Sequence, residues 1–589
     1  MTLGRSPSGG QSPRSSADFC HEQLSPTSIY ELLHRDGVRL FPDEEFADLF
    51  CEIGRWSVPP RILATVMVLQ RLEGLSDREA VDRFWFDLRW KYAAGGLDFD
   101  YPGFVHTVLV GLRARLRRSA RPHRIFERTL AVAREAGLIG RKRVLDSTAL
   151  YDAVATQDTV TLIRSAIRGV LRTCDELLAA AVRGCLRRDD DYATAGKPAC
   201  DWDDKAAREG LVDALARDAY AVLALLDGRQ LAPTVSEAAA LLATVVGQDL
   251  EQRTDGVFRV AHRVAKDRVI STVDPEARHG HKTAARSFDG YQGHVAIDPD
   301  SEIVTATAVT PGNVADGVMA AALLGDVLGE VQAHTPPPVD AAPSADDALP
   351  PAAALLSDAP PPADAPTPAD ALPPADAETP CDASSPTLAT VPAGAGAATS
   401  AATPAAFEVY GDASYGTAGV VELLEAAHVE ANVKVQGPSA PAGCFGKDAF
   451  EVDLEQQTVK CPAGVLVQIR RSADGGGFAT FGVGCHSCAL RTRCTDAKDG
   501  RTIRIHPHEA TLQRARTQQS SSSWKARYRA TRPKVERTLA HLMRRRHGGR
   551  RARVRGCLRI GQDFSLLVAA HNLRRLARRG VHFDRGWRR

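Results

Sequence analysis

The sequence predicts a mixed α/β protein: a sheet flanked by helices, a helical N-terminal domain, a helical insertion and a cysteine-containing insertion. Apolar residues recur at helical spacing over 27–130 and again over about 150–265. Short β-branched runs, which are typical of strands, lie on either side of the second helical stretch. The fold class follows from this alternation of helical and strand periodicity.

The composition indicates a soluble globular protein with two or three domains. The chain has 589 residues, of which 44% are hydrophobic and 25% charged. Residues 1–26 begin with a Ser/Pro/Gly stretch that we expect to be disordered, and no window has the run of about 18 apolar residues that a membrane-spanning helix needs. The 12 cysteines show no disulfide framework. We therefore expect a cytoplasmic protein with no membrane partner.

The charge is distributed unevenly along the chain. Residues 525–589 contain 21 Lys or Arg against three acids, so this segment carries +18, whereas the rest carries −16 of the net +2. Such a density of positive charge is typical of a protein that binds a polyanion, because each neutralised phosphate releases counterions. A solvated basic tail is the alternative. The segment 521–589 is thus a candidate DNA-binding element.

The helical N-terminal domain, residues 27–130, shows clear helix boundaries. Pro59 and Pro60 precede an apolar run, Ser76 and Glu79 form a capping box, and a third helix spans about 104–118. The aromatic residues of this domain are expected to fill its core: Phe84, Trp85, Phe86 and Trp90. Three helices are compatible with a helix-turn-helix, so this domain is a candidate for binding DNA.

Two acidic residues follow apolar strand patterns. Residues 141–146 read as a short buried strand that ends at Asp146, within a segment 141–330 that also contains the helical insertion and a predicted hairpin of 293–298 and 302–309. A Pro/Ala/Asp-rich tract at 331–406 cannot bury enough apolar surface to fold, and we expect it to be disordered. Residues 407–440 then supply a strand that runs into Asp412, a helix and a further strand. Taken alone, Asp146 could simply cap a turn.

Three blocks in this order resemble the catalytic blocks of bacterial insertion-sequence transposases of the DDE class. They are Val-Leu-Asp146-Ser-Thr, Tyr-Gly-Asp412-Ala-Ser-Tyr-Gly, and a late block in which Tyr528, Arg532 and Glu536 are spaced by four residues each. The sequence is most similar to the insertion-sequence five superfamily and its eleven-eighty-two branch. Further shared pieces are Asp274 to Arg278, Gly290-Tyr291, Thr310 to Val314 and Asn572 to Leu576.

This resemblance implies an RNase H-like catalytic core in which Asp146 lies on the first strand, Asp412 after the fourth strand and Glu536 on a following helix. It also implies that the three acids bind two Mg²⁺ ions, or Mn²⁺, which suit carboxylate oxygens and promote in-line displacement at phosphorus. The expected activity is cleavage and strand transfer of DNA, with terminal inverted repeats and target DNA as partners. We expect the protein to act as a homo-oligomer on DNA, in association with the bacterial nucleoid.

The predicted helix around Glu536 carries several candidate DNA-binding residues. Val535, Leu539 and Leu542 share an apolar face, and Pro533 in the first turn leaves Glu536 near the positive helix end, which favours its ionised form. A plain salt bridge between Arg532 and Glu536 is the alternative. The predicted DNA-binding residues are Tyr528, Arg532, Lys534, Arg537, Arg544, Arg545, Arg546, Arg550 and Arg551.

Four cysteines cluster in the segment 441–520. Cys461, Cys485, Cys488 and Cys494 have a spacing that suits tetrahedral zinc, with buried free thiols as the alternative. We expect any such Zn²⁺ to be structural and not catalytic. Two rival functions also remain open: a domesticated DNA-binding protein that no longer cuts, and an RNase H-fold nuclease that cleaves without strand transfer.

Overall fold

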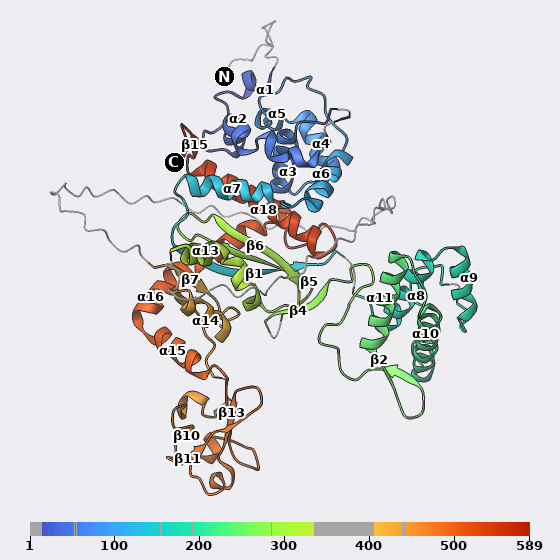
Figure 1. The fold of residues 1–589 in the computed structure, drawn as a ribbon, viewed down its shortest axis with the longest axis vertical. Helices are drawn as coiled ribbons and strands as arrows, with labels where there is room; N and C mark the ends of the chain where they lie inside the picture. Colours follow the sequence, from blue (N-terminus) through green and yellow to red (C-terminus); the bar gives the residue numbers. More distant parts are fainter. Residues whose placement is uncertain are drawn as a thin grey trace, which may run out of the picture. The chain divides into compact units, whose positions relative to one another are not determined.

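The computed structural model describes residues 15–51, 53–54, 56–153, 156–190, 192–283, 286–334, 406–438, 440 and 443–589. Its centre is a mixed sheet of six strands in the order β4-β5-β1-β7-β8, with β6 also paired to β5 (Figure 1). β1 runs antiparallel to β5 and parallel to β7, which is parallel to β8. The strands are β1 (Lys142–Tyr151), β4 (Arg278–Thr283), β5 (Arg286–Ile297), β6 (Val304–Pro311), β7 (Glu408–Gly411) and β8 (Glu430–Val433).

Two expectations about these strands can be compared with the structure. The hairpin of 293–298 and 302–309 is confirmed, since β5 and β6 pair antiparallel from Tyr291↔Pro311 to Ile297↔Val304. The prediction that this strand ends at Asp146 is wrong, because β1 continues for five more residues to Tyr151. The polar residues after Asp146 stay in the strand because they pair with β5 along its whole length.

Helices cover both faces of the sheet. Neighbouring residues of β1 alternate between two hydrophobic clusters: Val144 packs in the cluster that contains α17 and α18, and Leu145 in the cluster that contains α12 and α14. The flanking elements are η2 (Asp316–Met319), α12 (Ala320–Leu323), α13 (Gly325–His334), α14 (Ala418–Ala426), α15 (Glu509–Ser520), α16 (Ser522–Thr531), α17 (Pro533–Leu542), η6 (Arg545–His547) and α18 (Cys557–Arg578).

The N-terminal part is helical and packs against α18, which contacts both α3 and α7. The predicted capping box of Ser76 and Glu79 is present at the start of α4. Of the aromatic residues expected in the core, Phe84 and Trp90 are buried, but Trp85 and Phe86 are exposed on the opposite face of α4. The elements are α1 (Ser16–Cys20), α2 (Ile29–Leu40), η1 (Asp43–Leu49), α3 (Pro60–Glu73), α4 (Asp77–Phe86), α5 (Leu88–Ala93), α6 (Thr107–Arg118) and α7 (Arg124–Glu135).

The residues that begin and interrupt the chain differ in part from expectation. Disorder was expected for 1–26, yet α1 is folded, because Ser15 caps it and the Ser16 hydroxyl donates to the carbonyl oxygen of Leu97. Residues 1–14 lie outside the described residues. So does nearly all of the expected insert at 331–406, of which the structure describes only the end of α13, to His334, and Ala406.

The helical insertion forms a core of its own. Four helices and a small hairpin enclose a separate hydrophobic cluster, which includes Ile163, Leu215 and Val245. A buried ion pair of Arg164 with Asp190, 2.7 Å from Nη2 to Oδ1, fixes the loop after α9. The elements are α8 (Thr159–Thr173), α9 (Glu176–Cys185), α10 (Lys205–Leu226), α11 (Pro233–Asp249), β2 (Leu250–Gln252) and β3 (Phe258–Val260).

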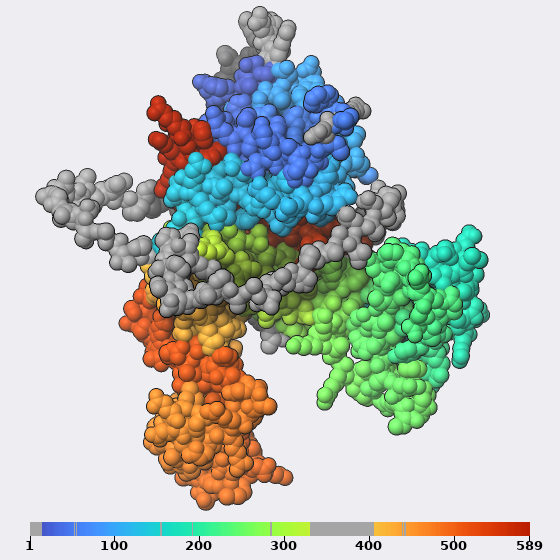
Figure 2. Space-filling view, in the orientation of Figure 1, coloured from blue at the N-terminus to red at the C-terminus, as the bar shows by residue number. Residues whose placement is uncertain are grey.

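The cysteine-containing segment also has its own core, built by Phe450, Val459 and Ile503 among others; its orange atoms form a rounded unit in Figure 2. It comprises η3 (Lys447–Ala449), β9 (Glu451–Asp453), β10 (Thr458–Lys460), β11 (Leu466–Gln468), β12 (Arg470–Arg471), β13 (Gly477–Thr480), η4 (Gly482–Cys485), η5 (Arg491–Arg493) and β14 (Thr502–Ile505). The chain ends in β15 (His582–Phe583) and β16 (Trp587–Arg588). None of the described helices is both long and apolar enough to cross a membrane.

Candidate active site

Asp146 lies in the middle of β1 and faces the helices α17 and α18. Side chains alternate along a strand, so Asp146 is on the same face as Val144, which packs in the cluster of those helices. The carboxylate is buried and accepts a hydrogen bond from the amide of Ser147 at 2.8 Å. Burial raises the pKa of Asp146, and the nearby charges of Arg532 and Lys282 oppose the shift.

The register of the parallel strands brings Asp412 beside Asp146. β1 and β7 pair with Val144 opposite Tyr410, so two further residues along each strand place Asp412 level with Asp146. β7 ends at Gly411, and Asp412 opens the turn that follows, where its Oδ1 accepts the amide of Ser414 at 3.0 Å. The second acid therefore lies just past a strand end, as the sequence predicted.

Glu536 occupies the first turn of α17, which begins at Pro533 as the sequence predicted. Val535, Leu539 and Leu542 are buried and hold this helix against the sheet. Glu536 projects from the other face, and 65% of its side chain is exposed. An acid at this position gains from the positive end of the helix dipole.

The guanidinium of Arg532 joins all three acids. Its Nη2 lies 3.1 Å from Asp146 Oδ2 and 3.6 Å from Asp412 Oδ2, and its Nη1 lies 3.5 Å from Glu536 Oε1. The Arg532 side chain is only 8% exposed. Burial alone would lower the pKa of Arg532, but the charges of Asp146 and Asp412 outweigh it and raise the pKa. Three segments that are far apart in sequence thus contribute carboxylates to one cation.

A cleft of about 440 Å³ opens over this arrangement. Asp412, Arg532 and Glu536 line it together with Lys434 and Tyr528. The cleft gives solvent and ligands access to the exposed carboxylate of Glu536, while Asp146 forms the buried side of the cluster.

A second polar network lies next to Asp146, in which Ser147, His294 and Asp316 are buried and Lys282 is exposed. The Ser147 hydroxyl donates to Asp316 Oδ2 at 2.8 Å, and the Lys282 ammonium donates to the carbonyl and hydroxyl oxygens of Ser147, both at 2.7 Å. His294 Nδ1 lies 3.6 Å from Asp316 Oδ1. A bulge in the β4–β5 pairing at Lys282 turns this lysine toward the site.

The sequence reading missed Lys282, His294 and Asp316. Two of these residues lie near motifs that carry the family resemblance. Asp316 closely follows the motif Thr310 to Val314, and His294 lies in β5, which also contains the motif Gly290-Tyr291. Burial raises the pKa of Asp316, and Lys282 opposes that shift. Lys282 had no sequence signal, because only the bulge places it beside Ser147.

The donor set suits a hard divalent cation, since three carboxylates already share one positive group. In the described part of the chain, however, no group of three or more His, Cys, Asp or Glu side chains stands ready to hold a metal ion. Arg532 lies among the three acids, within 3.6 Å of a carboxylate oxygen of each. A metal ion bound by the triad requires that Arg532 move aside.

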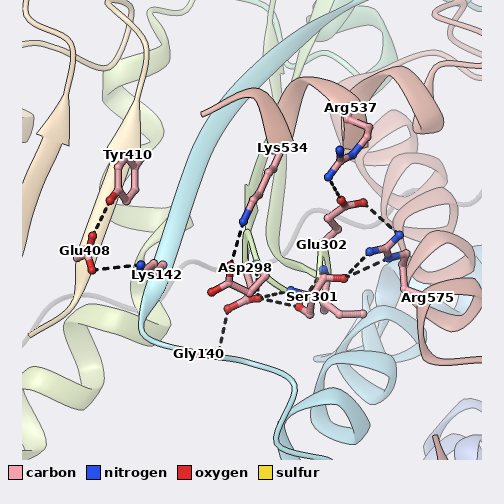
Figure 3. A network of polar contacts seen from close by, with 12 residues as sticks. Gly140, Lys142, Asp298, Ser301, Glu302, Glu408, Tyr410, Lys534, Arg537 and Arg575 are labelled. Atoms are coloured by element: carbon pink, nitrogen blue, oxygen red, sulfur yellow. Dashed lines mark hydrogen bonds and ion pairs between the residues drawn. The ribbon is translucent and has the colours of Figure 1, made fainter. Parts of the chain in front are cut away.

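The predicted DNA-binding residues near Glu536 have partners inside the protein. The Tyr528 hydroxyl donates to the carbonyl oxygen of Gly411 at 3.2 Å, Lys534 pairs with Asp300 at 3.0 Å, and Arg537 pairs with Glu302 (Figure 3). The two ion pairs reduce the charge that Lys534 and Arg537 present to a ligand. Their role in DNA binding stays a prediction.

The basic residues after α17 are exposed: Arg544, Arg545, Arg546, Arg550 and Arg551. The backbone that carries them is anchored, because the amide of Tyr151 donates to the carbonyl oxygen of Arg550 at 2.8 Å, and η6 packs against α3. Anchored exposed arginines lose less entropy when they bind a polyanion than arginines on a loose tail.

The four cysteines surround one small cavity, which Phe445, Phe450 and Phe481 also line. The amides of Arg501 and Leu490 donate to the Sγ atoms of Cys485 and Cys488, at 3.5 and 3.4 Å. Such bonds stabilise thiolates, so this donor set suits Zn²⁺, although among the described residues no three of these side chains form a ready metal site. The participating residues are Cys461, Cys485, Cys488 and Cys494.

Three models of known protein families match the sequence, and all three describe transposase domains. Two family models described as "Transposase DDE domain" match residues 256–335 and 460–577, and one described as "Transposase domain (DUF772)" matches residues 28–115. No curated protein and no solved structure matches significantly. The matches support a DDE transposase. They include Arg532 and Glu536 but neither Asp146 nor Asp412, which the fold brings to the same place.

Proposed function

We propose that the protein is a transposase of a bacterial insertion sequence, which binds the ends of the element and catalyses metal-dependent DNA cleavage and strand transfer. One observation carries the proposal: carboxylates from β1, from the turn after β7 and from α17 converge on Arg532 within 3.6 Å. Three acids gathered at one place need a positive charge, which Arg532 supplies in the metal-free protein and divalent ions would supply in the active form. The insertion-sequence five superfamily, eleven-eighty-two branch, is the proposed subgroup.

The proposed fold of the core is RNase H-like. Its support is the sheet, in which β1, β7 and β8 are parallel and β5 and β6 add antiparallel on the other side of β1. The positions of the acids also support it, because Asp146 lies on β1, Asp412 directly after β7, and Glu536 on a later helix.

Asp146, Asp412 and Glu536 would hold two Mg²⁺ ions, or Mn²⁺. Bound there, the ions would activate water or a 3′-hydroxyl and stabilise the leaving oxygen. The chain's own residues prepare this site: α17 orients Glu536, the amides of Ser147 and Ser414 orient the two aspartates, and Arg532 keeps the carboxylates together before metal binds.

The division of labour on DNA is also a proposal. The helical part at 27–130 would recognise the terminal inverted repeats, and the basic residues of 521–589 would bind the DNA backbone without reading sequence. The four cysteines would hold a structural Zn²⁺. Several copies of the chain would assemble on the DNA.

The test is a reaction of the purified protein with Mg²⁺, a labelled duplex that carries one end of the DNA bracketing the reading frame, and a plasmid target. A transposase yields both cleaved ends and labelled ends joined to the plasmid. Cleaved ends without joined product would indicate the nuclease. Binding without either product would indicate the domesticated DNA-binding protein.

A further inference from the structure

A pocket of arginines lies where α17, η6 and α18 meet. It has a volume of about 70 Å³ and lies at the end of α17 opposite Glu536. Four guanidinium groups line it, from Arg544 after α17 and from Arg574, Arg575 and Arg578 on α18. No acidic residue lines the pocket.

The positive charge of this pocket is largely uncompensated. Glu302 pairs with Arg575 at 3.1 Å, but it also pairs with Arg537 (Figure 3). Within the described residues, no carboxylate forms an ion pair with Arg544, Arg574 or Arg578. Burial lowers the pKa of Arg574, and the neighbouring charges of Arg578, Arg546 and Arg544 lower it further. The folded protein therefore keeps like charges together without a counter-ion.

Local structure accounts for only part of this cluster. Arg575 and Arg578 lie in the last turn of α18, where the helix dipole favours a cation. That effect falls off within one turn, so it explains neither Arg544, which follows a different helix, nor the gathering of both sets around one cavity. His541 and His571 also line the pocket, and burial lowers the pKa of both, to about 3 for His571.

The pocket and Glu536 lie along the same exposed face of α17. Glu536 and Ala540 are exposed on α17 at a spacing of four residues, and Arg544 follows after four more. Glu536 and His541 are separated by roughly 7.5 Å along the helix axis, at about 1.5 Å per residue. Measured along the axis of a DNA duplex, that distance corresponds to about two nucleotide steps, each of which rises roughly 3.4 Å.

We propose that this pocket, formed by Arg544, Arg574, Arg575 and Arg578, binds one backbone phosphate of the DNA substrate a few nucleotides from the reacting phosphate. It thereby sets the position along the strand that reaches Asp146, Asp412 and Glu536. Arginine forks fit phosphate oxygens in pairs, and Ser301 fixes Arg575 by accepting from its Nε and Nη2 at 3.1 and 2.9 Å. That the ligand is DNA rests on the proposed function. That the pocket binds phosphate rests on its own arginines.

The first test uses the protein without DNA or divalent metal. Thermal unfolding is followed in inorganic phosphate and in chloride at the same ionic strength. Phosphate should raise the unfolding temperature of the wild type and of an Arg172→Gln/Arg183→Gln control, at two exposed arginines of the helical insertion, by about 3 °C, because it binds only the folded state. The Arg574→Gln/Arg578→Gln protein should not respond. An equal response of all three proteins, or none in any, would overturn the pocket.

The second test places the phosphate on DNA. End DNA with one neutral methylphosphonate, scanned along the strand, is bound in the absence of divalent metal. At one position the neutral linkage should weaken wild-type binding about tenfold and leave binding by the Arg574→Gln/Arg578→Gln protein unchanged within twofold. If no position shows this coupling, the DNA assignment is wrong even when the protein cuts. If the double variant unfolds, Arg574→Lys/Arg578→Lys keeps the charge, and it should retain the phosphate response but lose part of the positional effect.

Discussion

At the scale of single residues, Arg532 organises the candidate site. The sequence predicted a helix in which Arg532 and Glu536 are one turn apart, with a salt bridge between them as one interpretation. Their ion pair at 3.5 Å agrees with that salt bridge. The two further contacts, to Asp146 and Asp412, could not be predicted, because they depend on how α17 packs against β1 and β7. Arg532, which was also expected to contact DNA phosphate, neutralises the acids in this structure, and its contact with DNA stays a prediction.

Replacing Arg532 with Met should therefore destabilise the metal-free protein. The buried carboxylate of Asp146 would lose its counter-charge, which costs about 3 kcal/mol in comparable buried pairs. Millimolar Mn²⁺ should restore more stability to this variant than to the wild type, because the ion no longer competes with Arg532. Chemical unfolding with and without Mn²⁺ measures both effects.

The control for this experiment is Arg527→Met, which removes an exposed ion pair with Glu430 and should change stability by less than about 1 kcal/mol. If Mn²⁺ stabilised the wild type and the Arg532 variant equally, the guanidinium and the ion would not share a site.

At the scale of elements, periodicity predicted the type of most segments but not their ends. α4, α6, α17 and the β5–β6 hairpin lie close to where the patterns placed them. β1 is longer than predicted because pairing with β5 retains Ser147 and Thr148, which have no strand pattern of their own. The exposed Trp85 and Phe86 show that aromatic residues at helical spacing need not all face the core.

The helical insertion offers a pH test at this scale. A hydrogen-bonded pair with Arg164 holds the pKa of Asp190 below its usual value near 3.9. A lowered folded pKa means that the pair stabilises the insertion above about pH 4, and that this contribution is lost as the pH falls below that value. Amide hydrogen exchange in α8 and α9 should show protection decreasing from pH 4 downward.

Asp190→Asn should remove this pH dependence and lower the local free energy of opening by about 3 kcal/mol at pH 7. Lys205→Gln, which removes only an exposed i,i+4 pair with Glu209, should leave both unchanged within about 0.5 kcal/mol. Unaltered protection in the Asp190 variant would show that the pair does not fix the insertion.

The cysteine segment gives a test by metal removal. If its thiols bind zinc, freshly purified reduced protein should contain about one Zn²⁺ per chain, and chelation should loosen residues 455–500 before the rest. Cys488→Ser should lower the zinc content, whereas Cys200→Ser, in the helical insertion, should not. Absence of zinc from the wild-type protein would leave buried free thiols as the interpretation.

At the scale of the whole molecule, the distribution of charge determines where DNA is expected to bind, and the sheet topology determines where the acids meet. The sequence predicted where the positive charge lies but not which residues remain available, because Lys534, Arg537 and Arg532 pair with acids from distant segments. The arginines after α17 stay exposed on an anchored backbone. The order of acids along the chain predicted a site, and only the β1–β7 register brought Asp412 level with Asp146.

Neutralising the five exposed arginines together should weaken binding to all DNA sequences alike. The variant carries Gln at 544, 545, 546, 550 and 551, and the slope of log affinity against log salt should flatten by up to about 4.5, since each phosphate contact contributes roughly 0.9. Titrations at several salt concentrations measure it. A changed preference for end DNA with an unchanged slope would mean that these residues read sequence.

The central claim is that Asp146, Asp412 and Glu536 form one metal-dependent active site. The most direct measurement is cleavage of end DNA in Mg²⁺ by Asp146→Asn, Asp412→Asn and Glu536→Gln proteins, with Glu425→Gln as a control at an exposed acid of α14. Each of the three should lose cleavage by at least about a thousandfold while DNA affinity changes less than about threefold, and the control should cut normally. Cleavage at the wild-type rate by any one of the three would contradict the account.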